Sequence, residues 1–391
     1  MSKRVALSGN EAAAHAIRQI NPDVIAAFPI TPSTPIPQNV SQFIADGRMT
    51  TEFVTVESEH SAISACVGAS AAGGRVMTAT SANGLALMFE ILYIASGMRR
   101  PIVAPVVARA LSGPLNIHGD FSDVYGVRES GWVELFCQDS QEFYDTIIQS
   151  VKLAENESVL TPVMPIADGF DISHTVENWY MEDDKAIQEF IGEYHSKYSL
   201  LDTEHPVTFG AWAPPDWYYE HRRSQLEGLL NACDAFKAVD KEFGEKFGRS
   251  YGVIEKYHSD DADIIVIGMG AVSGTIKDAI DEMRANGISA GFLRVKLFRP
   301  FPYKDIIEAL KGAKAIGVFD RCITAGAQTA ALCTDIRSAM YGKSNIPIVN
   351  YTYGLGGRDT TVSHVKTVIE QLKEAAEGKK IDLINYINLR A

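Results

Sequence analysis

Short apolar runs that stop at turn residues recur from residue 23 to residue 167, and stretches with helical spacing separate them. Runs of this length that are rich in β-branched residues are typical of strands. Strands are predicted at 23–28, 51–56, 75–80, 101–107, 133–137 and 162–167, and helices at 35–44, 57–72, 85–97 and 141–155. Because near-continuous apolar strands alternate with helices, we expect an α/β fold with a doubly wound parallel sheet covered on both faces.

Polar residues directly follow two of these predicted strands. Residues 28–35 place the Thr31 hydroxyl just after the first strand, and residues 56–60 place the Glu59 carboxylate just after the second. Parallel strands that precede helices end at one edge of a sheet, which is where α/β proteins build active sites. The alternative is ordinary helix capping, in which hydroxyls and acidic residues favour a helix N-terminus.

The same pattern resumes from residue 262 to residue 350 and predicts a second, smaller doubly wound domain. Its first strand runs into Gly268, Gly270 and Gly274, a spacing that allows phosphate binding at a helix N-terminus. A dinucleotide site would need an acidic residue at the end of the following strand, and residues 295–299 provide none there. Tight strand-to-helix turns are therefore the favoured explanation of these glycines.

Between the two blocks the chain is poor in strand signals. Aromatic and charged residues crowd at 177–198 and 212–220, and a long polar helix is predicted at 222–247. The aromatic residues either anchor a protein interface or pack back onto the first domain. We expect three parts: a first domain at 1–172, a connecting arm and long helix at 173–259, and a second domain at 260–391.

Composition narrows the class of protein. The 391 residues are 46% hydrophobic and carry a net charge of −13, which argues against binding to nucleic acid or to an anionic membrane surface. No apolar leader or membrane-spanning run is evident, so a cytoplasmic protein is expected. The five cysteines are scattered without a CxxC pair or clustered histidines, so no zinc site and no iron–sulfur cluster is expected in this chain.

Two further loops of the first domain carry polar chemistry. Residues 78–84 follow the third strand, and their hydroxyls, the Asn83 amide and a glycine are suited to lining a cofactor pocket. Residues 107–112 follow the fourth strand and include Arg109, whose forked guanidinium matches a carboxylate. The alternative for Arg109 is a surface salt bridge.

Several motifs, in this order, resemble the separate α subunit of the pyruvate:ferredoxin oxidoreductase family. In the first domain they are Pro29-Ile30-Thr31-Pro32, Glu57-Ser58-Glu59-His60, Thr78-Ala79-Thr80-Ser81, Arg109-Ala110-Leu111-Ser112, Ser122-Asp123, Gly131-Trp132 and Asp168-Gly169-Phe170. The motifs at 298–302 and 353–359 resemble the family's transketolase C-terminal-like domain. The resemblance implies a thiamine-diphosphate-binding domain of the pyrimidine type, followed by that smaller α/β domain.

The resemblance also implies an activity and its partners. Members oxidise 2-oxoacids with thiamine diphosphate, coenzyme A and iron–sulfur clusters, here converting pyruvate to acetyl-CoA and CO2 or the reverse. The α subunit supplies the pyrimidine half of the thiamine site. A β subunit supplies the diphosphate and Mg²⁺ half and a cluster, and γ and δ subunits or their equivalents carry the other clusters and coenzyme A contacts. Ferredoxin takes the electrons, and the α chain alone is expected to be inactive.

The family's site residues carry over to matching positions. Glu59 resembles the glutamate that hydrogen-bonds the pyrimidine N1′ and so favours the tautomer that removes the thiamine C2 proton. Arg109 and Thr31 resemble the residues that hold the substrate carboxylate and carbonyl. Pro29 resembles the residue that shapes the pyrimidine pocket. Ser81 and Asn83 are further pocket candidates, and no metal ligand is expected in this chain.

The sequence departs from the family pattern at two places. Phe121 stands where a histidine is frequent, which puts a polar role at that position in doubt, and Ala108 stands where asparagine is common. Within the family, a branched-chain 2-oxoacid or 2-oxoglutarate remains an alternative substrate, and oxalate is disfavoured because an arginine is expected there in place of Thr31. Outside it, the alternatives are a nicotinamide-dependent dehydrogenase and a noncatalytic scaffold subunit.

Overall fold

A mostly parallel sheet of eight strands forms the centre of the N-terminal half of the computed structural model, which describes residues 2–390. The order is β13-β7-β8-β5-β4-β2-β3, with β6 also pairing with β8, and only β13 is antiparallel to its neighbour. The strands are β2 (Val24–Ala27), β3 (Glu52–Thr55), β4 (Val76–Met77), β5 (Ile102–Val103), β6 (Val106–Ala108), β7 (Val133–Phe136), β8 (Val163–Asp168) and β13 (Leu297–Arg299).

Helices cover both faces of this sheet, as the apolar strands require. Ala26 of β2 belongs to one buried cluster, whereas Ile25 and Ala27 belong to the other, because successive strand side chains point to opposite faces. Helices α3 to α6 contribute to the first cluster, and α1, α2 and α7 contribute to the second. The helices are α1 (Gly9–Ile20), α2 (Pro35–Ala45), α3 (Glu59–Ala71), α4 (Ala82–Leu87), α5 (Phe89–Gly97), α6 (Ser122–Val127), α7 (Ser140–Ala154) and α8 (Asp184–Ile191).

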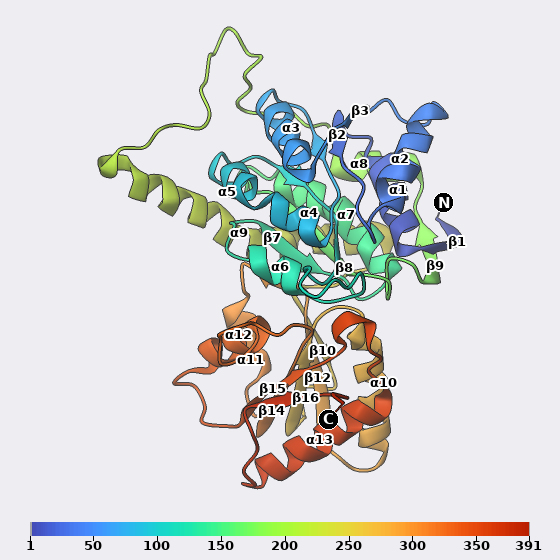
Figure 1. The fold of residues 1–391 in the computed structure, drawn as a ribbon, viewed down its shortest axis with the longest axis vertical. Helices are drawn as coiled ribbons and strands as arrows, with labels where there is room; N and C mark the ends of the chain where they lie inside the picture. The colour runs from blue at the N-terminus through green and yellow to red at the C-terminus, as the bar shows by residue number, and fades with distance from the viewer. Residues whose placement is uncertain (1, 391) are drawn as a thin grey trace.

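A second, six-stranded sheet has the order β10-β12-β11-β14-β15-β16 and lies below the first in Figure 1. Only β10 is antiparallel within it. Helices α10 and α13 pack on one face, and α11 and α12 pack on the other. These elements are β10 (Ile254–Tyr257), β11 (Ile264–Gly268), β12 (Ala290–Val295), β14 (Ala315–Asp320), β15 (Ile348–Thr352), β16 (Ile384–Tyr386), α10 (Val272–Ala285), α11 (Tyr303–Ala309), α12 (Ala331–Met340), α13 (Val362–Ala376) and the 3-10 turn at Leu355–Gly357.

The connecting segment forms a small ribbon, a long loop and a long helix. Strand β9 (Val176–Met181) pairs with β1 (Lys3–Ser8), and helix α9 (Pro215–Phe247) follows an extended loop that projects from the body (Figure 1). The helix begins at Pro215 rather than at the predicted residue 222, because proline is well suited to a first helical turn. The side chain of Trp212 is 88% exposed, so this aromatic residue does not pack back onto the first domain.

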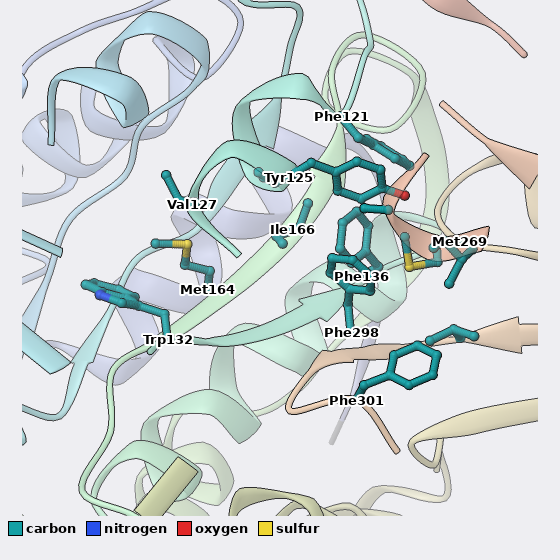
Figure 2. Packing of buried hydrophobic residues seen from close by; sticks show 14 of the residues in the cluster. Phe121, Tyr125, Val127, Trp132, Phe136, Met164, Ile166, Met269, Phe298 and Phe301 are labelled. Carbon is teal, nitrogen blue, oxygen red and sulfur yellow. The ribbon is translucent and has the colours of Figure 1, made fainter. Parts of the chain in front are cut away.

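An aromatic cluster packs around β13 near the junction of the two sheets, and a buried charge cluster joins them. Phe298 lies close to Tyr125 and Phe136, with ring centroids 5.2 and 5.7 Å apart, and Phe121 packs on Phe136 at 5.0 Å (Figure 2). Glu142 of α7 accepts hydrogen bonds from Arg294 and from Lys296, whose Nζ lies 2.6 Å from its Oε1. Phe121 therefore has an apolar packing role at this junction.

The structure divides two predicted strands. The predicted strand at 101–107 is β5 and β6, separated around Pro105, which has no amide hydrogen for the ladder. Within the second block, the sequence predicts one strand at 291–297. The structure instead forms β12 in the second sheet, and Leu297 already belongs to β13 of the first sheet. None of the helices within residues 2–390 is long and apolar enough to cross a membrane.

Candidate active site

Glu59 is the first residue of α3, and its side chain is buried with 6% exposure. The hydroxyl of Ser58 caps the helix by accepting the Ser61 N–H at 3.2 Å, so the Glu59 carboxylate is not needed as a cap. Within residues 2–390 this carboxylate has neither a hydrogen-bond partner nor an ion pair. A buried carboxylate rarely stays unpaired, so the site suits a ligand that bonds to it.

A second unpaired polar group lies beside it. The buried hydroxyl of Thr80 has no hydrogen-bond partner in the described part of the chain. A Cβ placed on Gly84 would lie 2.6 Å from Glu59 Oε1 and 2.7 Å from Thr80 Oγ1, so both groups converge on this glycine. Thr80 belongs to the motif Thr78-Ala79-Thr80-Ser81, but nothing in the sequence distinguished its hydroxyl from those of Thr78 and Ser81.

Arg109 follows β6 directly, and the structure brings it to Thr31. Its Nη1 donates to the Thr31 carbonyl oxygen at 2.8 Å, and its Nε donates to the Asn116 carbonyl oxygen at 3.2 Å. The side chain is 6% exposed and forms no ion pair with any residue from 2 to 390, so the surface salt bridge is excluded there. Thr31 itself lies at the exposed turn before α2.

Three further predicted residues occupy the same region. The Ser81 hydroxyl is buried and donates to the Val107 carbonyl oxygen at 2.6 Å, which joins the loop after β4 to strand β6. Asn83 is exposed, and its Oδ1 accepts from the Ser112 hydroxyl at 2.9 Å. Pro29 is exposed between β2 and α2. The Ser81 and Asn83 side chains thus bond to the chain itself, and their cofactor roles stay predictions.

Asp123 was not among the predicted site residues. It is buried, and its Oδ2 accepts the backbone N–H groups of Ala82 at 2.8 Å and Arg109 at 2.9 Å. Its Oδ1 accepts the N–H of Val124 at 2.8 Å. Burial raises the pKa of this carboxyl to about 7, although the three amide donors oppose the shift. The only indication of Asp123 in the sequence was that it belongs to the Ser122-Asp123 motif, one of those that resemble the family.

The motif at 168–170 serves the junction with the second sheet. Asp168 accepts from Arg321 Nη1 at 2.6 Å and from the Ala271 N–H at 3.0 Å. Gly270 has a φ of 75°, and a Cβ there would lie 2.2 Å from Asp168 Oδ1. A turn with close backbone approach therefore explains this glycine, in agreement with the interpretation favoured from the sequence.

Two family models match the chain. The model described as pyruvate flavodoxin/ferredoxin oxidoreductase, thiamine diphosphate-binding, matches residues 15–241. The model described as pyruvate:ferredoxin oxidoreductase core domain II matches residues 262–365. The first match alone spans more than half of the 391 residues.

Curated relatives are similar over nearly their full length. The pyruvate synthase subunit PorA of Thermotoga maritima is 49% identical over 390 residues, which cover 99% of this chain and 98% of the relative. The PorA subunit of Pyrococcus furiosus is 44% identical over 392 residues, covering 100% and 99%. The ketoisovalerate oxidoreductase subunit VorA of Pyrococcus abyssi is 43% identical over 378 residues, covering 96% and 95%.

Two solved structures share the fold. A 2-oxoglutarate:ferredoxin oxidoreductase from Magnetococcus marinus, with 2-oxoglutarate, coenzyme A and succinyl-CoA bound, matches with a TM-score of 0.71 at 20% identity. The match covers 95% of this chain and 65% of that one. A split-gene transketolase, an inactive β4 tetramer, matches with a TM-score of 0.57 at 12% identity, covering 95% and 100%. These likenesses confirm the predicted α/β fold class.

Proposed function

The chain belongs to the pyruvate:ferredoxin oxidoreductase family, and on this premise we propose that it is the α subunit of a pyruvate synthase. With its partner subunits it converts pyruvate and coenzyme A to acetyl-CoA and CO2, passing electrons to ferredoxin, or runs the reverse reaction. The observation that carries the proposal is the nearly full-length similarity to PorA subunits. The unpaired carboxylate of Glu59, at a position matching the family's thiamine-binding glutamate, supports it.

The residues around Glu59 fit a thiamine diphosphate pyrimidine ring. When bound, this cofactor supplies a carbon nucleophile that adds to the oxo group of the substrate. Glu59 would hold a proton in a hydrogen bond to the pyrimidine N1′, and the Thr80 hydroxyl, which also lies beside Gly84, would offer a second polar contact. Pro29 would shape the pocket wall, while Ser81 and Asn83 fix the loops that border it.

We propose that the Arg109 guanidinium binds the carboxylate of a 2-oxoacid. Its bonds to the Thr31 and Asn116 carbonyl oxygens orient the fork, and the Thr31 hydroxyl lies in the same turn to bond the substrate carbonyl. A fixed orientation of this kind lowers the entropy lost on reaching the reactive geometry. When Arg109 binds the substrate carboxylate, it therefore also fixes the position of the oxo carbon.

The relatives are named as subunits, which supports assembly with other chains. We infer a β subunit that supplies the diphosphate and Mg²⁺ half of the site and a cluster. Further subunits, γ and δ or their equivalents, would carry the other clusters and coenzyme A contacts. We also propose division of the chain at residues 172 and 259, although β13 reaches from the last part into the first sheet.

A branched-chain 2-oxoacid is the second candidate substrate, because the VorA relative is nearly as similar as some PorA relatives. Thiamine diphosphate content distinguishes the proposal from a nicotinamide enzyme. The complex would be purified anaerobically through a tag on this chain, and its cofactors would be extracted and quantified. We expect about one thiamine diphosphate per copy of this chain. Bound nicotinamide cofactor with no thiamine diphosphate would overturn the proposal.

A further inference from the structure

The loops after β4 and β6 carry the site residues, and one buried carboxylate joins them. Asp123 Oδ2 accepts the N–H of Ala82 at 2.8 Å and the N–H of Arg109 at 2.9 Å, and Oδ1 accepts the N–H of Val124 at 2.8 Å. Amide donors are bound more strongly by an ionised carboxylate than by a neutral acceptor. The backbone that carries Arg109 is therefore fixed directly to the backbone of the Ala82 turn.

The Ala82 turn has a conformation that alanine disfavours. Its φ is 45°, in the left-handed region, and the residue is fully buried. Such a conformation persists only where surrounding contacts impose it, and these residues are frequent at active sites. Two residues later, Gly84 lies against the Glu59 carboxylate. The bond from Ala82 to Asp123 therefore fixes the turn that packs on Glu59.

Asp123 is in turn fixed by the second sheet. It lies on the short helix α6, whose neighbouring residue Phe121 donates its N–H to the Arg321 carbonyl oxygen at 2.8 Å. The Tyr125 hydroxyl on the same helix donates to Asp320 Oδ1 at 2.8 Å. Both rings lie in the aromatic cluster of Figure 2. The C-terminal sheet thus sets the place of α6 and of its carboxylate.

We propose that Asp123 is a positioning residue. It holds the Arg109 loop and the Ala82 turn in fixed positions relative to each other, and so sets both substrate affinity and the geometry at Glu59. The inference rests on the proposed function. It gives the second sheet a role in the site, because α6 transmits its position to two loops of the first sheet. Asp123 acts through Arg109 and the turn and does not touch the substrate.

The substitution Asp123→Ala tests this in the assembled complex. Alanine removes both carboxylate oxygens, so the N–H groups of Ala82 and Arg109 both lose their acceptor. We expect the KM for the 2-oxoacid to rise about tenfold and kcat to fall, with unchanged thiamine diphosphate content. The control is Asp120→Ala, in the loop before α6. The Asp120 carboxylate accepts from the Ser122 N–H rather than from Ala82 or Arg109, so this variant should leave both constants near wild type.

A second substitution separates the two loops. Glycine adopts a φ of 45° without strain, so adding Ala82→Gly to Asp123→Ala should restore kcat, because the turn at Glu59 no longer needs the carboxylate. The raised KM should remain, because the Arg109 loop is still unanchored. An unchanged KM in Asp123→Ala, or recovery of both constants together, would overturn the inference.

Amide hydrogen exchange of the wild-type complex gives a test that does not depend on a folded variant. The N–H groups of Ala82 and Arg109 should exchange slowly, whereas the exposed loop around Leu115 exchanges fast. Exchange of Ala82 and Arg109 at the rate of that loop would refute the inference. A wild-type complex with intact clusters that oxidises no 2-oxoacid would instead refute the proposed function itself.

Discussion

Glu59 is the residue on which the proposed chemistry depends most, because its carboxylate is expected to bond the cofactor. The sequence predicted its place, because an acidic residue directly after a strand reaches the functional edge of a parallel sheet. Arg109 and Thr31 were brought together for the same reason. The roles of Thr80 and Asp123 could not be predicted, because an unpaired hydroxyl and a carboxylate shared by two loops exist only in the folded chain.

Replacing Glu59 with glutamine should abolish most turnover. Glutamine keeps the size of the side chain but can no longer exchange a proton with the pyrimidine ring, so we expect kcat to fall by at least about a hundredfold. Viologen dye reduction by the anaerobic complex measures this. The exposed Glu57 is the matched control, and Glu57→Gln should retain activity. A fully active Glu59→Gln complex would favour the scaffold alternative.

Gly84→Ala should damage the same site by steric means. The new Cβ would lie 2.6 Å from Glu59 Oε1, which forces the carboxylate or the turn to move. We expect kcat to fall at least about tenfold while the complex still assembles. Gly274→Ala is the control, because a Cβ there meets no atom within 4 Å. Equal activity of the two variants would show that the Glu59 position tolerates displacement.

Arg109→Lys should weaken substrate binding more than it slows turnover. Lysine keeps the charge but cannot bond both the Thr31 and Asn116 carbonyl oxygens and still offer a fork to the substrate. The KM for the 2-oxoacid should rise by about tenfold to a hundredfold, as measured from initial rates. Arg284→Lys, in helix α10 of the second domain, is a charge-matched control. A normal KM in Arg109→Lys would remove Arg109 from the substrate site.

At the scale of elements, hydrophobic periodicity predicted the alternation of strands and helices but not how strands are shared between sheets. Residues 290–299 form one continuous stretch with Arg294, Lys296 and Arg299 among apolar residues, yet β12 and β13 lie in different sheets and Lys296 lies between them. Lys296 is fully buried because Glu142, 154 residues away, accepts its hydrogen bond. Pairing of this kind between distant residues leaves no local pattern in a sequence.

Strand β7 carries a buried carboxyl that should make stability depend on pH. Neither oxygen of Glu134 has a hydrogen-bond partner among residues 2–390, and burial raises its pKa from 4.5 to about 8. The folded chain keeps this proton up to about pH 8, whereas the unfolded chain releases it above 4.5. Its contribution therefore lowers stability as the pH rises from 4.5 towards 8.

Glu134→Gln should flatten this dependence, because glutamine does not titrate. The difference in unfolding free energy between about pH 5.5 and about pH 8 should shrink by on the order of 1 kcal/mol or more. Thermal unfolding of the purified complex at the two pH values measures it. Glu129→Gln is the control, since this side chain is 75% exposed. An unchanged pH dependence in Glu134→Gln would show that Glu134 is ionised in the folded chain.

At the scale of the whole molecule, two sheets are joined into one support for the site. The Tyr125–Asp320 hydrogen bond, the Glu142 charge cluster and the Asp168–Arg321 ion pair all cross the junction. The order of strands and helices along the chain indicated two α/β blocks. It did not indicate that the C-terminal block would fix the position of α6 and contribute β13 to the N-terminal sheet. The projecting loop and the start of α9 stand apart from this support (Figure 1).

The most direct test of the central claim is the substrate preference of the intact complex. The complex, purified anaerobically through this chain, would be assayed for coenzyme A-dependent dye reduction with pyruvate, 2-oxoisovalerate, 2-oxoglutarate and oxalate. We expect kcat/KM to be at least about tenfold higher for pyruvate than for the other acids. A cluster-loaded, thiamine-containing complex that oxidises another acid preferentially, or none of them, would contradict the assignment as a pyruvate synthase subunit.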